Sequence, residues 1–188
     1  MKPDFKLINF LQTGFRLCLR RLRTQGLKAT LIWLYGRGTT IITGIPVMKY
    51  SQITPEIYVG SQYRSLGKHR LERLGVTGSI NLRVEFDDRI HGLVLKDYCY
   101  LPVVNGDAPT LEQLTAGVSF IQQVLAAGGK VYIHCQAGLG RAPTMAAAYF
   151  VSQGYTLAEA VRLIQKSRPF IEITPVQIEQ LERFAATR

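Results

Sequence analysis

The residues best suited to chemistry lie in one short stretch, VYIHCQAGLGRAPTMAAAYF, at positions 131–150. Cys135 supplies a thiol, and Arg141 follows six residues later, beyond two glycines that allow successive backbone N–H groups to point into one concavity. The Ala-rich run after Arg141 predicts a helix, whose N-terminus attracts anions and favours a thiolate. A guanidinium binds two oxygens of a tetrahedral anion at once. The pattern therefore predicts that Cys135 attacks a phosphorus atom held by the loop and by Arg141.

The elements that must position this loop alternate between strands and helices from about residue 50 onward. Short β-prone runs occur at 57–59, 79–82, 98–103 and 131–134, and helical periodicity occurs at about 64–74, 110–127, 142–153, 156–167 and 175–187. This alternation predicts an α/β domain with a mostly parallel central sheet flanked by helices. The loop then follows the carboxyl end of a strand, where open α/β sheets bind ligands.

Composition limits the class of protein. The 188 residues are 47% hydrophobic and 19% charged, which suits one globular domain with a short appendage. Three cysteines, widely spaced, form no disulfide framework, so we expect a reducing compartment on the cytoplasmic side. We expect Cys99, in the run YCYLPV, to pack in the interior rather than act as a redox partner of Cys135. The cysteines and histidines lack metal-ligand spacing, so we expect no metal and no cofactor.

The net charge of +10 is concentrated near the N-terminus. Residues 1–50 hold nine Lys or Arg and the single acid Asp4, and the remainder is nearly balanced. We therefore divide the chain into a basic amphipathic N-terminal appendage, 1–49, and a catalytic domain, 50–188. A nucleic-acid partner is not expected, because the basic residues belong to no recognisable binding module.

Two segments make up this appendage. In the segment 5–25, apolar residues recur at helical spacing on one face and arginines on another. The apolar positions are Ile8, Leu11, Phe15, Leu19 and Leu22, and the basic ones are Arg16, Arg20 and Arg23. Such a helix either lies on an anionic membrane, in a peripheral contact through residues 5–48, or on a partner, or it packs against the catalytic domain with a solvated arginine face. Glycines, Arg37 and Pro46 interrupt the apolar stretch 30–48, which argues against a transmembrane helix.

The loop also resembles a known family. HCQAGLGR is similar to the HCxxGxxR phosphate-binding loop of cysteine-dependent phosphatases, and the compact length resembles the dual-specificity branch. PTLEQLTAGVSF and RPFIEITPVQIEQLERF resemble mitochondrial tyrosine phosphatases whose relatives dephosphorylate phosphatidylglycerophosphate, whereas GLGRAP is similar to plant glucan phosphatases. The resemblance implies a dual-specificity phosphatase-like fold, a phosphocysteine intermediate, and phosphate binding by Gln136, Ala137, Gly138, Leu139 and Gly140.

The resemblance also implies a general acid on a loop before the cysteine. In LPVVNGDAPT the carboxylate is Asp107, which either protonates the leaving oxygen or merely begins a turn before the next helix. Glu85, Asp87 and Asp88 are alternative acids, although a solvated acidic loop is the role we expect for them. Family members carry Ser or Thr after the loop arginine to stabilise the departing thiolate, and this chain has Ala142 instead.

Three functions remain open at this point. The first is hydrolysis of phosphotyrosine, and of phosphoserine or phosphothreonine, in proteins. The second is hydrolysis of a non-protein monoester, such as phosphatidylglycerophosphate or a phosphoglucan, and the basic N-terminus favours a lipid substrate among these. The third is a phosphate-binding module with weak catalysis, which only Ala142 and the ambiguous acid favour.

Overall fold

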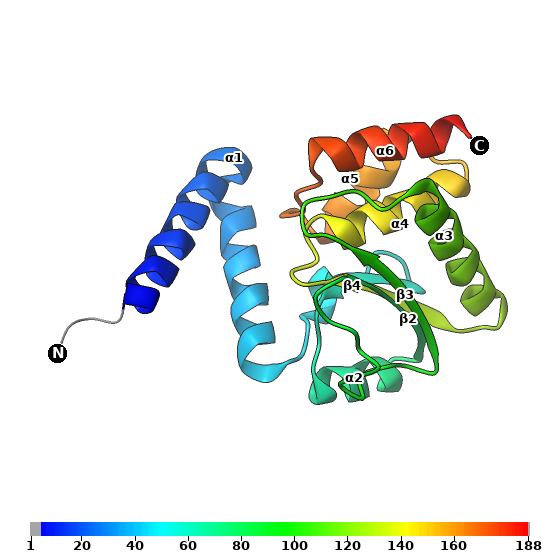
Figure 1. The fold of residues 1–188 in the computed structure, drawn as a ribbon, viewed down its shortest axis with the longest axis horizontal. Coiled ribbons are helices and arrows are strands. Elements are labelled where there is room, and N and C mark those ends of the chain that lie inside the picture. The colour runs from blue at the N-terminus through cyan, green and yellow to red at the C-terminus, as the bar shows by residue number, and fades with distance from the viewer. Residues whose placement is uncertain (1–4, 188) are drawn as a thin grey trace.

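A computed structural model describes residues 5–187 of the chain, with side chains described from Cys18 onward. Four strands form the central sheet: β1 (Ile57–Ser61), β2 (Val76–Arg83), β3 (Asp97–Val103) and β4 (Lys130–Cys135). Their order is β1-β4-β2-β3, and every neighbouring pair is parallel (Figure 1). The predicted parallel sheet is confirmed, and each strand contains its predicted run.

Helices cover both faces of this sheet. Helices α3 (Leu111–Ala126), α4 (Arg141–Ser152), α5 (Leu157–Ser167) and α6 (Pro175–Ala186) lie on one side, and α2 (Ser65–Arg73) lies on the other (Figure 1). Thr110 and Thr156 begin α3 and α5 with capping boxes, in which each side chain accepts the backbone N–H three residues later. These five helices match the predicted ranges to within two residues at either end.

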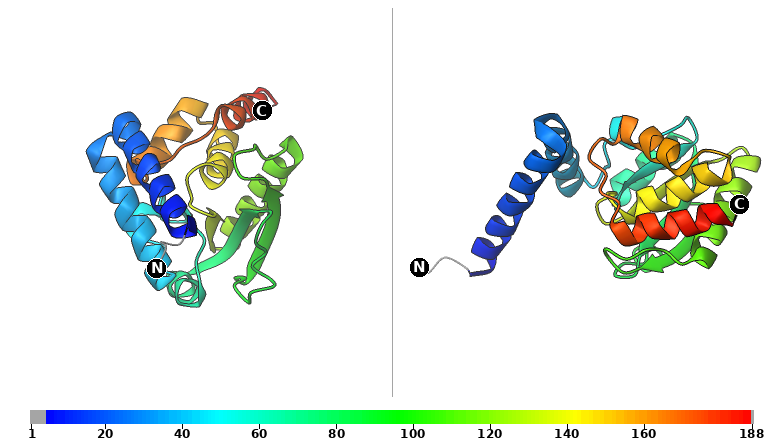
Figure 2. Two further views of the ribbon diagram at one scale, coloured as in Figure 1. Left: turned by 60° about the vertical axis from the view of Figure 1, so that its left-hand side comes forward. Right: turned by 90° about the horizontal axis from the view of Figure 1, so that it is seen from above.

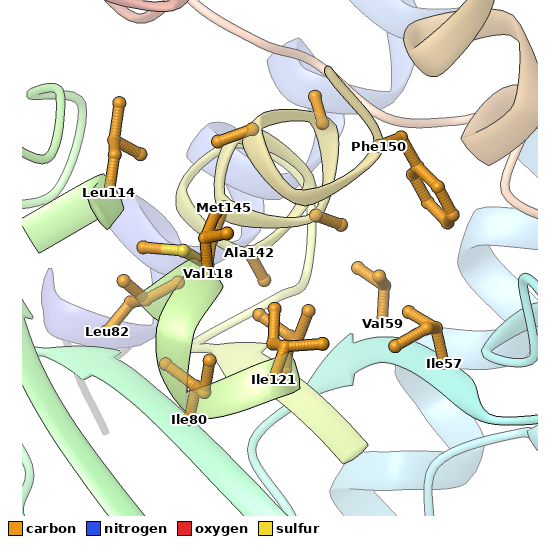
Figure 3. Packing of buried hydrophobic residues seen from close by; sticks show 14 of the residues in the cluster. Ile57, Val59, Ile80, Leu82, Leu114, Val118, Ile121, Ala142, Met145 and Phe150 are labelled. Atoms are coloured by element: carbon orange, nitrogen blue, oxygen red, sulfur yellow. The ribbon is translucent and has the colours of Figure 1, made fainter. Parts of the chain in front are cut away.

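The main core lies between the sheet and the α3–α4 layer. Figure 3 shows Val118 and Ile121 of α3 and Met145 and Phe150 of α4 close to Ile57, Val59, Ile80 and Leu82 of the strands, and Leu114 belongs to the same buried cluster. Alternate residues of β4 divide between the two faces, because successive strand side chains point in opposite directions. Ile133 and Cys135 belong to this core, while Tyr132 packs with Tyr63 and Leu71 on the α2 side. Cys135 therefore ends its strand on the face covered by α4.

The N-terminal helix α1 (Phe5–Thr43) is bent at Gly26, whose φ of 79° and ψ of 171° are not helical. Glycine adopts this positive φ with little strain, so the helix predicted over 5–25 ends there and a second helical half follows. Figure 2 shows the first half extending away from the sheet and its helices. In the second half, Ala29 and Trp33 pack with Phe170 of the segment between α5 and α6. Within residues 5–187, no helix is both long and apolar enough to cross a bilayer.

Candidate active site

Cys135 lies at the base of the loop that joins β4 to α4. Its side chain is buried, and its Sγ accepts a hydrogen bond from the Gly138 N–H at 3.3 Å. Gly138 has a φ of +67°, and a Cβ there would lie 2.5 Å from the backbone carbon and oxygen of Gly60. Only glycine fits at this position, because both the conformation and the space exclude a side chain. The loop therefore turns back over the thiol and directs an N–H group at it.

Arg141, the first residue of α4, is fixed from three sides. Its Nη1 donates to the Val103 carbonyl at 2.7 Å and to the Leu82 carbonyl at 3.2 Å. Both Nη atoms also donate to Glu85, Nη1 to Oε2 and Nη2 to Oε1, each at 3.0 Å. Burial disfavours its charge, but Glu85 and then Cys135 outweigh that effect and raise the pKa of Arg141. The guanidinium is therefore held in one orientation beside the thiol.

Glu85 has a specific role that the sequence did not reveal. Hydrogen bonds from Arg141, with a further one from Arg83, lower the pKa of Glu85 to about 2. The carboxylate is therefore ionised at neutral pH and has no proton to give. Its pairing with both Nη atoms of Arg141 favours a role in orienting that arginine over a role as the general acid.

The other two acids of this loop, Asp87 and Asp88, each contact neighbouring side chains. Asp88 is completely buried, and its Oδ2 lies 2.9 Å from His134 Nε2, while Gln62 donates to its Oδ1 at 2.8 Å. His134, next to the nucleophile, therefore contacts a carboxylate from the facing loop. The Asp87 carboxylate accepts hydrogen bonds from Arg89 and from the Tyr98 hydroxyl, and these lower its pKa to about 2. The expectation of a solvated acidic loop was wrong for Asp88, whereas Glu85 is exposed even though it pairs with Arg141.

A buried arginine from outside the motif supports the loop. Arg168, after α5, donates from Nε and Nη2 to the Gly138 carbonyl at 3.3 and 3.1 Å. Its Nη1 donates to the Tyr50 carbonyl at 2.6 Å. Complete burial lowers the pKa of Arg168 to about 10, which leaves it charged at neutral pH. Arg168 thus ties the loop to the segment before β1 and adds a positive charge beneath it.

A cleft of about 410 Å³ opens above the loop and is lined by Cys135, Arg141 and the loop residues Gln136, Ala137, Leu139 and Gly140. Gln177 also lines it, and its Nε2 donates to the Asp107 carbonyl at 2.8 Å. Among the described residues, Asn105 and Gly106 line the cleft while Asp107 does not. The expected acid loop therefore borders the cleft, with the exposed Asp107 immediately beyond its lining.

The N-terminal helix reaches the same loop. Arg37 of α1 donates to the Gln136 carbonyl at 3.3 Å, and Arg20 is part of the cleft lining. Arg21 is 1% exposed, and it donates to the Phe170 carbonyl at 3.1 Å and to Glu172 at 2.8 Å. Residues 21–25 thus pack against the catalytic domain through Arg21 and Gln25, while Arg20 and Arg23 of the predicted arginine face are exposed. Sequence periodicity could not distinguish Arg21 from its neighbours, because its partners lie about 150 residues away.

The two remaining cysteines are not part of the cleft lining. Cys99 in β3 is partly buried against the main core, and burial raises its pKa to about 11. Packing, the role we expected for Cys99, is what the structure shows. Ala142 is also completely buried in this core, directly after Arg141. Its methyl group provides no hydroxyl at the position where the resemblance implies one.

Comparison with known proteins places these features in a family. The model of the dual specificity phosphatase catalytic domain matches residues 57–187. The human phosphatidylglycerophosphatase and protein-tyrosine phosphatase 1 is 32% identical over 145 residues, which cover 72% of each chain. Human dual specificity protein phosphatase 1 is 32% identical over 122 residues, which cover 64% of this chain and 33% of that protein. The region that the family model matches begins after α1.

Solved structures agree with these matches. The crystal structure of PTPMT1 superposes with a TM-score of 0.66 at 30% identity, covering 73% of this chain and 94% of that one. A second structure of that protein, in complex with PI(5)P, gives the same TM-score at 28% identity. The parallel sheet and the helices that cover it are thus shared with these phosphatases. The chain belongs to the dual specificity phosphatase family and is a cysteine-based phosphoric monoester hydrolase.

Proposed function

We propose that Cys135 is the nucleophile and that the reaction passes through a phosphocysteine. The thiolate attacks the phosphorus of a bound monoester, the P–O bond to the leaving group breaks, and a proton is transferred to the leaving oxygen. Water then attacks the phosphocysteine, releasing inorganic phosphate and restoring the thiolate. The backbone of residues 136–140 and Arg141 would bind the phosphate oxygens in both steps, which is how positioning and charge accelerate phosphoryl transfer.

One observation carries this proposal. Arg141 is held by Glu85 and two carbonyls beside a buried thiol that already accepts the Gly138 N–H. A preorganised donor set costs little reorganisation when charge develops in the transition state. We assign the general acid to Asp107, because its loop borders the cleft and the pKa of Glu85 is too low for proton donation.

We propose phosphorylated proteins, with phosphotyrosine first, as one substrate class. A phosphorylated lipid is the second candidate, and the outer face of α1 favours it.

In the second half of α1, several apolar side chains are more than 40% exposed at helical spacing: Leu27, Leu31, Leu34, Tyr35, Ile41 and Ile42. They form one continuous stripe, because positions three, four and seven apart lie on the same face. The net charge of +8 over residues 1–50 complements an anionic bilayer. We therefore propose peripheral membrane contact through α1, on the cytoplasmic side.

The nucleophile is tested by Cys135→Ser with a phosphotyrosine peptide and with para-nitrophenyl phosphate. We expect turnover of both to vanish, vanadate to inhibit the unmodified protein, and EDTA to leave its activity unchanged. Activity retained in Cys135→Ser, or lost on chelation, would contradict the proposal.

Membrane contact is tested with a matched pair of variants. Ile42 in the stripe is 82% exposed, and Ile90 in the loop between β2 and β3 is 80% exposed. Burying such a side chain contributes roughly 1.5–3 kcal/mol, so Ile42→Asp should lower the partition onto phosphatidylglycerol vesicles about tenfold or more. Ile90→Asp adds the same charge elsewhere and should change it less than twofold. Equal losses of vesicle binding in both variants would show that only net charge matters. Unchanged vesicle binding in both would show that the stripe does not contact the membrane.

A further inference from the structure

Arg20 of α1 lies in the cleft that holds the reacting groups. It lines one continuous cavity together with Cys135, Arg141, Asn105 and Gly106. Arg20 comes from a helix that precedes the region matched by the phosphatase family, residues 57–187. This guanidinium is therefore an addition to the site rather than a part of the shared loop.

The neighbouring Arg21 keeps Arg20 in place. Arg21 is buried against the Trp33 ring, 4.7 Å from its centroid, and donates to Phe170 and Glu172. Glu172 in turn donates its backbone N–H to the Leu139 carbonyl at 2.7 Å, so this contact connects α1 to the phosphate loop. A buried, multiply bonded guanidinium has little freedom to move. The backbone of α1 is thus fixed at this point, with Arg20 in the lining of the cleft.

The charges of Glu172, Arg20 and Arg21 do not balance. Glu172 pairs with both arginines, Oε1 with Arg20 at 2.7 Å and Oε2 with Arg21 at 2.8 Å. One carboxylate therefore pairs with two guanidinium groups, which leaves one positive charge without a balancing acid. Arg20 is the one of the two arginines that solvent reaches. The Arg20 side chain is 57% exposed, against 1% for Arg21. Within the described part of the chain, its guanidinium has Glu172 as its ion-pair partner, which leaves donors available for an anion.

We propose that Arg20 is a specificity residue that binds a second anionic group of the substrate while the loop holds the phosphomonoester. The group is the phosphodiester of a phospholipid whose head group ends in the phosphomonoester. Leu19, which is 36% exposed, lines a surface hollow together with Arg20, Arg23 and Thr24, so an apolar side chain lies beside this cation. A phosphodiester that continues into acyl chains matches an arginine beside an exposed leucine better than an acidic peptide does. This inference rests on the lipid candidate of the proposed function.

The test compares two soluble substrates, so that vesicle binding does not affect the result. The first is glycerol 3-phosphate, which carries one phosphomonoester. The second is the deacylated head group glycerophosphoglycerol phosphate, which carries the same monoester and a phosphodiester. We expect Arg20→Gln to lower the ratio of kcat/KM for the second substrate to that for the first about tenfold, the effect of losing one charge-assisted hydrogen bond. The matched control is Arg23→Gln, which removes the same charge from an exposed position outside the cleft lining and should change the ratio less than twofold.

Each other outcome overturns the inference. An unchanged ratio in Arg20→Gln, or an equal loss on both substrates, would mean that Arg20 only supports the loop. Equal changes in Arg20→Gln and Arg23→Gln would indicate a general effect of charge. A loss confined to a phosphotyrosine peptide with flanking acidic residues would assign Arg20 to protein substrates. Cys135→Ser distinguishes failure of the proposed function, because it must abolish turnover of every substrate whatever Arg20 binds.

Discussion

Replacing Glu85 with Gln tests whether the arginine of the loop must be oriented by a carboxylate. Gln has nearly the same shape but no charge, and it can accept from one Nη atom where Glu85 accepts from both. Arg141 keeps its bonds to the Leu82 and Val103 carbonyls, so we expect the loop to stay folded.

The size of the effect follows from the exposure of the pair. Hydrogen bonds to charged groups contribute about 1.5–3 kcal/mol when buried, and exposed ion pairs contribute about 0.2–1 kcal/mol. The Arg141 side chain is 1% exposed but that of Glu85 is 36% exposed, so solvent screens one end of the pair. We therefore take an intermediate value of about 1.4 kcal/mol, which corresponds to about a tenfold loss in kcat/KM.

The assay is kcat/KM for para-nitrophenyl phosphate between pH 4 and pH 8. The pKa of Glu85 is lowered to about 2 by Arg141, so the ion pair is fully formed above the ordinary pKa of a glutamate and is lost only as pH falls towards 2. Glu85→Gln should therefore lower the whole profile without moving its acid limb. Glu182→Gln, at an exposed position of α6, is the control and should behave as the unmodified protein. A loss below twofold, or a displaced acid limb, would refute the assigned role.

Three further changes test other parts of the site. Asp107→Asn should slow a phosphotyrosine peptide about a hundredfold more than an aryl phosphate with an acidic leaving group, and equal losses would make Asp107 structural. If the missing hydroxyl slows breakdown of the phosphocysteine, stopped-flow traces should show a product burst that shrinks in Ala142→Ser; an unaltered trace would mean that another group stabilises the thiolate. Arg168→Lys keeps the charge but loses the fork on the Gly138 carbonyl, so it should lower Tm by about 5 °C in calorimetry, and an unchanged Tm would remove its role in holding the loop.

The sequence by itself determined the features that depend on neighbouring residues. Strand and helix periodicity placed the parallel sheet and the helices α2 to α6, because each pattern reflects which face of a single element is buried. The phosphate loop could also be found, since Cys135, its glycines and Arg141 lie within seven consecutive residues. A contiguous loop adopts its geometry locally, from glycine conformations and the start of a helix.

Contacts between distant segments were decided only by the tertiary structure. Glu85 and Arg141 are 56 residues apart, and Arg168 and Gly138 are 30 apart, so no local pattern distinguishes Glu85 from Asp87 or Arg168 from a surface arginine. The N-terminal helix shows the same limit. Its periodicity placed leucines on one face and arginines on another, but Gly26 redirects the chain and buries Arg21 against Phe170 and Glu172. Which side of a helix is buried depends on what it packs against, and that partner is set by the path of the whole chain.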